Sequence, residues 1–404
     1  MIDMIINNKY RLRRISFARR LNIRVKIVIL VELRHFQISF KILLFRILND
    51  NRTKSRINYL CHNNMNRNFR DGINFISKFS FKRAWNAFLI LSSFYYSKWT
   101  KKASNWGYPV ALSFEPTTSC NLRCPECPSG LRSFTRPTGM LESDFFRKVI
   151  DETNSYLWYL IFYFQGEPYL HPEFTELVKY ASSKNIYTAT STNAHYLTDA
   201  NARKTVESGL DRLIISIDGT TQEVYQQYRI GGKLEKVLEG TKNIVKWKKE
   251  LKSKTPHIIF QFLVVKPNEH QMQEVEKLAE ELGVDEVAFK TAQVYEYENG
   301  NDLIPDNEHY SRYKKKSDGT YEIKNQLLNQ CWKMWHSCVI TWDGSVVPCC
   351  FDKDASHPMG NLQESTFKEV WNSNNYRNFR GKLLQSRDQI DICKNCTEGT
   401  KVWG

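Results

Sequence analysis

The sequence predicts an α/β protein in which helices cover a parallel sheet, followed by a small cysteine-rich α+β domain at the C-terminal end. Two observations lead to this prediction. Between residues 110 and 290, six apolar runs alternate with stretches of helical periodicity, and six of the ten cysteines fall between Cys331 and Cys396. Repeated strand-then-helix units place helices outside a parallel sheet, and right-handed crossovers curl that sheet toward a barrel.

The elements are expected in the following order. Strands are predicted at 110–114, 159–164, 186–190, 212–217, 258–265 and 286–290. Helices are predicted at 142–153, 173–184, 199–208, 234–252 and 271–282. Residues 108–292 would therefore form the barrel, and residues 293–330, which break the repeat, a connector.

An N-terminal helical segment at 65–107 precedes the barrel, with an aromatic-rich helix at 81–99. This helix is expected to pack against the barrel. The alternative is that its aromatic face docks on a membrane surface. The basic residues around that face are Lys82, Arg83, Lys98, Lys101 and Lys102.

Charge is distributed unevenly along the chain. Of the formal net charge of +15, residues 1–70 contribute +13, from 16 Lys or Arg and three Asp or Glu. The rest of the chain is nearly neutral, which argues against a specific nucleic-acid-binding body. The basic extension at 1–64 has three interpretations: an arm on an anionic surface, an added domain, or sequence upstream of a true start at Met65.

Composition and cysteine usage indicate the compartment. A hydrophobic content of 41% is ordinary for a soluble protein, and no uncharged run approaches the roughly 18 residues of a membrane span. No cleavable signal peptide is evident. Because clustered cysteines indicate metal thiolates, which need a reducing compartment, a cytoplasmic location is expected.

The first cysteine group follows the first predicted strand. Cys120, Cys124 and Cys127 are spaced CxxxCxxC. Three thiolates can hold a [4Fe–4S] cluster and leave one iron without a protein ligand, where a small molecule can bind and react. A structural zinc site is the alternative, but zinc requires four ligands and no fourth Cys or His lies nearby in sequence.

This motif resembles the signature of the radical S-adenosylmethionine (SAM) superfamily, although Glu126 replaces the usual aromatic residue. The resemblance implies a partial TIM barrel of about six β/α units with its chemistry at the C-terminal strand ends. It also implies that SAM chelates the open iron. The reduced cluster would then cleave SAM to methionine and a 5′-deoxyadenosyl radical that abstracts hydrogen from a substrate.

Further segments resemble the SAM contacts of that family. Phe164-Gln165-Gly166-Glu167-Pro168 is similar to its GGEP motif, so Gly166 and Glu167 are expected near the SAM ammonium. By the same resemblance, Asn193 would contact the ribose, and Ser216 and Arg229 the ribose or carboxylate.

Two candidate SAM contacts, Arg229 and Val264, have alternative interpretations. The alternative for Arg229 is a surface ion pair instead of a SAM contact. Val264 packs either on the adenine of SAM or in the protein core. No catalytic acid–base residue is assigned. Asp218, Glu115 and His195 lie near predicted strand ends, but such residues are more often structural.

The second cysteine group spans residues 331–404. A hairpin turn is predicted at Asp343-Gly344. The spacing of Cys331, Gly344 and Cys349 resembles the leading motif of the SPASM/twitch accessory domain. With so few later cysteines, the resemblance implies one auxiliary [4Fe–4S] cluster. Its ligands would be Cys331, Cys349, Cys393 and Cys396, with Cys338 and Cys350 as possible replacements and a zinc ribbon as the alternative.

The resemblance therefore implies a radical SAM enzyme that oxidises or crosslinks a peptide or protein, or a small alcohol. A flavodoxin- or ferredoxin-type protein would supply electrons. Two other functions are the alternatives. A non-catalytic iron–sulfur electron carrier or redox sensor would not need Gly166, Glu167 or Arg229. A nucleic-acid or membrane-surface protein would depend on residues 1–70, and its binding would weaken steeply with salt.

Overall fold

A mixed sheet of nine strands is the central element of the part of the chain that the computed structural model describes, residues 60–399 and 402. Six of its strands are parallel neighbours in chain order. These are β1 (Ala111–Phe114), β2 (Tyr159–Ile161), β3 (Tyr187–Thr192), β4 (Arg212–Ser216), β5 (His257–Val264) and β6 (Glu286–Thr291). The interpretations of residues 1–64, including a start at Met65, fall almost entirely outside the described residues and stay predictions.

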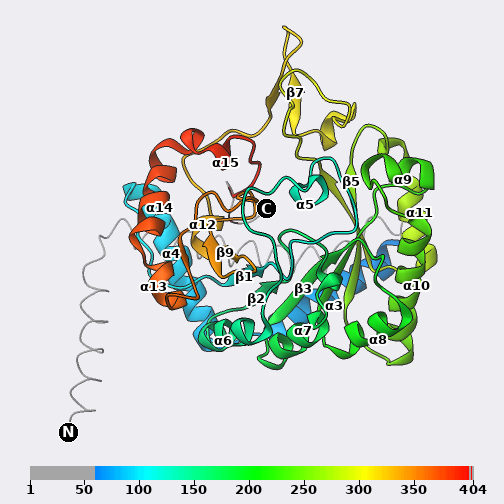
Figure 1. Ribbon diagram of the computed structural model, residues 1–404, viewed down its shortest axis with the longest axis horizontal. Helices are drawn as coiled ribbons and strands as arrows, with labels where there is room; N and C mark the ends of the chain where they lie inside the picture. The colour runs from blue at the N-terminus through cyan, green and yellow to red at the C-terminus, as the bar shows by residue number, and fades with distance from the viewer. Residues whose placement is uncertain (1–59, 400–401, 403–404) are drawn as a thin grey trace. The chain divides into compact units, whose positions relative to one another are not determined.

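Helices connect these strands and lie along the outer side of the curved sheet (Figure 1). They are α6 (Ser143–Thr153), α7 (Phe174–Ser183), α8 (Asp199–Glu207), α9 (Gln222–Tyr228), α10 (Leu234–Glu250) and α11 (Met272–Leu282). The predicted α/β fold, a partial barrel of six β/α units, is confirmed. Of these six helices, α9, a short helix in the β4–β5 connection, was not predicted.

Burial explains why the strands read as apolar runs. Five of the six residues of β3 are buried, and β5 is similar, because helices cover a parallel sheet from outside.

Capping explains where the helices begin and end. The side chain of Thr198 accepts a hydrogen bond from Asn201 N at 3.3 Å to start α8, and Gly283 ends α11 at a φ of +78°.

The C-terminal region continues the same sheet. The strands β9 (Ser337–Ile340), β10 (Ser345–Val347) and β11 (Gly360–Asn361) extend it, with β9 parallel to β1 and antiparallel to β10. The predicted hairpin turn at Asp343-Gly344 joins β9 and β10. Four helices complete the region: α12 (Lys333–His336), α13 (Phe367–Trp371), α14 (Asn374–Ser386) and α15 (Asp391–Lys394).

The predicted connector contains a hairpin of its own, formed by β7 (Tyr313–Lys315) and β8 (Tyr321–Ile323). Figure 1 shows it in yellow, projecting from the sheet. Its lysines are exposed, and Lys314 pairs with Glu322 across the two strands at 2.8 Å.

Within residues 60–107, two helices precede the barrel, α3 (Leu60–Ser77) and α4 (Phe81–Thr100). One side of α4 packs inward through Ile90 and Phe94, while Phe81 is 87% exposed and Trp85 53% exposed. Arg83 does not belong to the exposed basic residues around this face. It is buried and donates hydrogen bonds to the backbone oxygens of Asn185 at 2.5 Å and Asn154 at 3.0 Å. Within the described range, no helix is long and apolar enough to cross a bilayer.

Candidate functional site

The first cysteine group lies in the loop between β1 and the short helix α5 (Pro128–Leu131), at the C-terminal end of the strand. Backbone hydrogen bonds attach this loop to its neighbours. Arg123 N donates to the oxygen of Ile230 at 2.9 Å, and Glu167 N donates to the oxygen of Ser119 at 2.8 Å. The loop is therefore held by the segments that follow β2 and β4, as expected for a site at the C-terminal strand ends.

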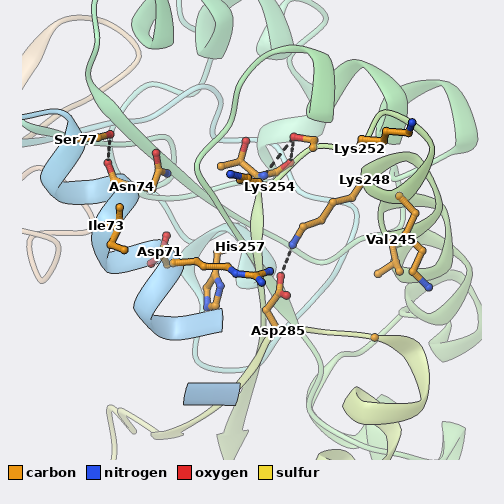
Figure 2. Close-up of a pocket in the computed structure, with 15 residues that line it drawn as sticks. Asp71, Ile73, Asn74, Ser77, Val245, Lys248, Lys252, Lys254, His257 and Asp285 are labelled. Carbon is orange, nitrogen blue, oxygen red and sulfur yellow. Dashed lines mark hydrogen bonds and ion pairs between the residues drawn. The ribbon is translucent and has the colours of Figure 1, made fainter. Parts of the chain in front are cut away.

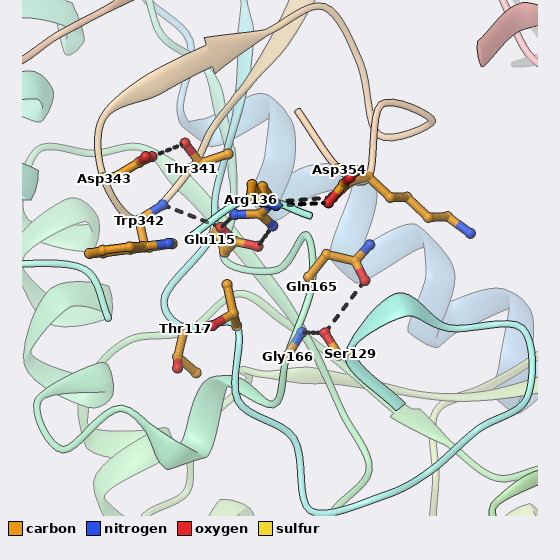
Figure 3. Close-up of polar contacts among 12 residues, drawn as sticks. Glu115, Thr117, Ser129, Arg136, Gln165, Gly166, Thr341, Trp342, Asp343 and Asp354 are labelled. Carbon is orange, nitrogen blue, oxygen red and sulfur yellow. Dashed lines mark hydrogen bonds and ion pairs between the residues drawn. The ribbon is translucent and has the colours of Figure 1, made fainter. Parts of the chain in front are cut away.

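Gly166 allows the closest of these approaches. Its φ is +76°, and a side-chain carbon at this position would lie 2.1 Å from the backbone oxygen of Thr117. Only glycine fits there. Figure 3 shows its backbone N–H directed at Ser129 Oγ, 2.9 Å away. The Gln165 side chain, which replaces a glycine of the family motif, lies 3.8 Å from Cys127 Sγ.

Glu167 is almost fully buried, and its carboxylate is bound within the protein. It accepts hydrogen bonds from Thr192 Oγ1 at 2.6 Å and from Asn193 N at 2.8 Å. Burial raises the pKa of Glu167 to about 6, although these hydrogen bonds oppose the shift. Glu167 thereby fixes the end of β3 against the segment after β2, and its direct contact with SAM stays a prediction.

Two other predicted contacts reach the cysteine sulfurs. Asn193 Nδ2 lies 4.0 Å from Cys120 Sγ, and Arg229 Nη1 lies 3.7 Å from Cys124 Sγ. Arg229 Nε also pairs with the buried carboxylate of Asp218 at 2.5 Å, so its ion pair is internal rather than on the surface.

The remaining candidates lie at strand ends. Ser216 is the buried last residue of β4, and Val264, the last of β5, is fully buried. His195 receives a hydrogen bond from Lys233 N at 2.9 Å, and Glu115 pairs with Arg136 at 2.5 Å. Together with the Asp218–Arg229 pair, these contacts show that Asp218, Glu115 and His195 each have a partner within the protein.

The loop residues suit an iron–sulfur cluster. Burial raises the pKa of Cys120 to about 11, and the charges of Glu167, Cys124 and Cys127 act in the same direction. Donors such as Asn193 Nδ2 and Arg229 Nη1 stabilise the negative sulfur of a cluster. No group of three His, Cys, Asp or Glu side chains in the described ranges is arranged to hold a single metal ion.

Four cysteines of the second group lie around one small cavity. Cys331, Cys349, Cys393 and Cys396 all line it. Five apolar and three charged residues complete the lining: Met334, Phe351, Phe379, Leu383, Ile392, Lys333, Arg387 and Glu398. The four thiols fit a cluster with a protein ligand on each iron.

Cys338 and Cys350 do not line this cavity. Cys338 is buried in β9 opposite Leu112 of β1, where it belongs to the core, and Cys350 is exposed.

One buried cation and several polar residues at these sites were not predicted. Arg387 is fully buried and places Nη2 3.4 Å from Cys396 Sγ. Arg136 and Asp354 join the cysteine loop to the C-terminal region, as described below. No spacing or motif distinguishes these residues in the sequence.

A separate cavity of about 710 Å³ lies at the N-terminal strand ends, between α3 and the end of α10 (Figure 2). None of the predicted site residues lines it. Lys248, one of its lysines, pairs with Asp285 at 2.5 Å. The lysines at the end of α10 also interact favourably with the negative end of the helix dipole. This interaction explains part of the positive charge around the cavity.

Comparison with known proteins identifies both cysteine regions. Residues 114–282 match the family model described as "Radical SAM superfamily", and residues 331–397 match SPASM, described as an "Iron-sulfur cluster-binding domain". The chain belongs to the radical SAM superfamily. It is a radical SAM enzyme with a SPASM domain. Its cofactors are SAM, the [4Fe–4S] cluster that binds SAM, and auxiliary iron–sulfur clusters in the SPASM domain.

Two curated relatives cover most of the chain. The "Tungsten-containing aldehyde ferredoxin oxidoreductase cofactor-modifying protein" of Pyrococcus furiosus is 28% identical over 71% of this chain and 86% of its own length. The "PqqA peptide cyclase" of Gluconobacter oxydans is 24% identical over 73% of this chain and 85% of its own. Among solved structures, Streptococcus suis SuiB bound to S-adenosylmethionine shares the fold, with a TM-score of 0.54 and 13% identity over 72% of this chain and 73% of that one.

Proposed function

We propose that this radical SAM enzyme oxidises or crosslinks a peptide or protein, with its SAM-binding cluster on Cys120, Cys124 and Cys127. The observation that carries the proposal is the convergence of Gly166, Asn193 and Arg229 on the cysteine loop. Asn193 Nδ2 and Arg229 Nη1 lie 4.0 and 3.7 Å from two of its sulfurs. When bound, the cluster and SAM supply a 5′-deoxyadenosyl radical that removes a hydrogen atom from the substrate.

The protein residues position and shield this site. Gly166 lets the segment after β2 lie against the cysteine loop, and Glu167 fixes that segment to the end of β3 through Thr192 and Asn193. The Asp218–Arg229 ion pair holds a guanidinium beside Cys124, where its remaining N–H groups suit the carboxylate of SAM. Asn193 and Ser216 at the neighbouring strand ends would contact the ribose.

The second cluster is proposed on Cys331, Cys349, Cys393 and Cys396, which line one small cavity. Four protein ligands leave no iron open, so this centre would accept the electron that a substrate radical gives up. Arg387 would offset its negative charge from within the protein. A flavodoxin- or ferredoxin-type protein would supply the electron that the first cluster needs.

A peptide substrate is favoured over a small alcohol by the relatives. One is named a PqqA peptide cyclase, and another solved structure shows SuiB bound to the precursor peptide SuiA. SuiB shares only 12% identity with this chain. It therefore supports a fold that can accommodate a peptide, but it does not indicate which peptide this chain would bind.

The test is anaerobic reconstitution with iron and sulfide, followed by addition of SAM and dithionite. We expect methionine and 5′-deoxyadenosine in equal amounts, measured by liquid chromatography. Protein that binds both clusters but forms no 5′-deoxyadenosine would instead be an electron carrier or redox sensor. Candidate peptides and small alcohols, compared by how much each stimulates 5′-deoxyadenosine formation, then separate the two substrate classes.

A further inference from the structure

Two cations, Lys353 and Arg312, contact residues of the segment 291–295, which follows β6 and leads into the connector. Lys353, from the loop after β10, places Nζ 2.8 Å from Tyr295 Oη and 4.8 Å from the centre of that ring. Tyr295 N in turn donates to Glu126 Oε2, inside the cysteine motif, at 2.9 Å. The Lys353 ammonium therefore lies between the SAM-cluster loop and the auxiliary region.

Arg312, in the connector, contacts the first residue of this segment, Thr291. Its Nε donates to Thr291 at the end of β6, with 3.1 Å to the backbone oxygen and 3.0 Å to Oγ1. Its neighbour Tyr313 bonds through Oη to both backbone groups of Val294, at 2.8 and 3.0 Å, next to Tyr295. Burial lowers the pKa of Lys353, and the charge of nearby Arg312 lowers it too, although charges on the cysteine loop oppose this.

One donor of Arg312 is left without a partner. Its Nη1 is buried, and among the described residues no acceptor lies within hydrogen-bonding distance of it. A buried cationic donor without an acceptor is costly, and proteins retain such groups where a ligand completes them. An oxyanion is the ligand that both a guanidinium and an ammonium would bind.

A network of polar contacts around Arg136 holds the backbone at Lys353, and Figure 3 shows its members Glu115, Arg136 and Asp354. Arg136 makes a two-pronged ion pair with Glu115, at 2.8 and 2.5 Å, and its Nε donates to the backbone oxygen of Lys353 at 3.4 Å. The next residue, Asp354, accepts from the backbone N of Thr135 at 2.9 Å and of Arg136 at 3.4 Å. Figure 3 shows Arg136 between Glu115 and Asp354, so the segment after the cysteine loop is fixed to the base of Lys353.

We propose that Lys353 and Arg312 form a substrate subsite for an oxyanion, a carboxylate or a phosphate, beside the SAM cluster. This inference rests on the proposed function, because it names a chemical feature of the substrate for the same site. For a peptide substrate the group is an Asp or Glu side chain or the C-terminus. For a small alcohol it is a phosphate or a carboxylate.

The test is calorimetric titration of the reconstituted enzyme with blocked single amino acids as probes. N-acetylglutamate amide and N-acetylphosphoserine amide carry the oxyanion, and N-acetylglutamine amide and N-acetylserine amide are their neutral counterparts. We expect at least one charged probe to bind about tenfold or more tightly than its neutral counterpart. The tighter of the two charged probes distinguishes a carboxylate substrate from a phosphorylated one.

Variants locate the binding. Lys353→Met should weaken the charged probe about tenfold and leave the neutral probe unchanged, whereas Lys353→Arg should keep the preference. Lys382→Met, which removes an exposed lysine of α14, is the matched control and should behave as the wild type. Iron content and circular dichroism show that each variant is folded.

Equal binding of charged and neutral probes, or equal loss in Lys353→Met and Lys382→Met, would overturn the subsite. Because these titrations do not depend on SAM cleavage, the two proposals fail separately. SAM cleavage without a charge preference removes only the subsite. A charge preference without SAM cleavage removes only the proposed reaction.

Discussion

The two cysteine regions of this protein differ in the number of thiols, in their surroundings and in how the chain encloses them. The first presents three cysteines on one loop at the strand ends, beside polar side chains from two neighbouring strand ends. The second gathers four cysteines that are up to 65 positions apart in the sequence around a cavity with a largely apolar wall. Under the proposed function, the first cluster keeps one iron open for SAM, whereas four protein ligands would leave no open iron in the second.

The difference is consistent with the two roles that we propose for the iron–sulfur clusters, SAM binding at the first and electron transfer at the second. A site that must bind SAM needs an open iron and donors for a carboxylate and an ammonium, which Arg229 and the segment at Gly166 provide. For the second site we propose electron transfer alone, which needs a closed ligand shell and a fixed charge. Arg387 would supply that charge, since it is held by hydrogen bonds to the oxygens of Gln330 and Glu398 at 2.9 and 2.8 Å.

Removing one cysteine from each region tests this contrast most strongly. We expect Cys124→Ala to reduce 5′-deoxyadenosine formation to background, because the cluster that SAM binds loses a ligand. Cys331→Ala should lose substrate turnover but keep SAM cleavage. Each variant should lose about four of roughly eight irons per chain, measured by iron analysis.

Cys350→Ala is the control for both, because this exposed cysteine does not line the cavity and should keep all its iron. If Cys331→Ala also abolished SAM cleavage, the two regions would not have separate tasks.

The Glu115–Arg136 pair, which links the two regions, is the next test. Glu115 is fully buried, and replacing it with glutamine leaves Arg136 in the interior without its counter-charge. We expect Glu115→Gln to lower the free energy of unfolding by about 3–5 kcal/mol. Urea denaturation of the apoprotein measures this loss.

The surface pair Arg203–Glu207 on α8 is a matched control, because its atoms lie 2.8 Å apart but both side chains are about half exposed. Glu207→Gln should cost only about 0.5 kcal/mol. Equal effects of the two substitutions would mean that the buried pair does not hold the regions together.

The barrel was predictable from the sequence, and the link between the two regions was not. Parallel strands such as β3 and β5 are buried on both faces, so their apolar runs and the helices between them are visible in the residues alone. The pairing of β9 with β1 joins residues more than 200 positions apart, and nothing in either strand specifies its partner. Cysteine spacing marked candidate ligands, but Arg136, Lys353 and Arg387 act only through neighbours that the fold brings to them.

The smallest expected effect concerns the pH dependence of the open site. Burial raises the pKa of Glu167 to about 6 from an ordinary value of 4.5. The folded state therefore binds a proton more tightly than the unfolded state, and stability falls as the pH rises through this interval. Between pH 5 and pH 7.5 the loss of stability is about 1 kcal/mol.

Glu167→Gln cannot ionise and should lack this loss, so the difference in free energy of unfolding between wild type and variant should shift by about 1 kcal/mol over that range. A difference that stays constant with pH would mean that Glu167 has an ordinary pKa, and that its hydrogen bonds to Thr192 and Asn193 fully offset its burial beside the open cluster.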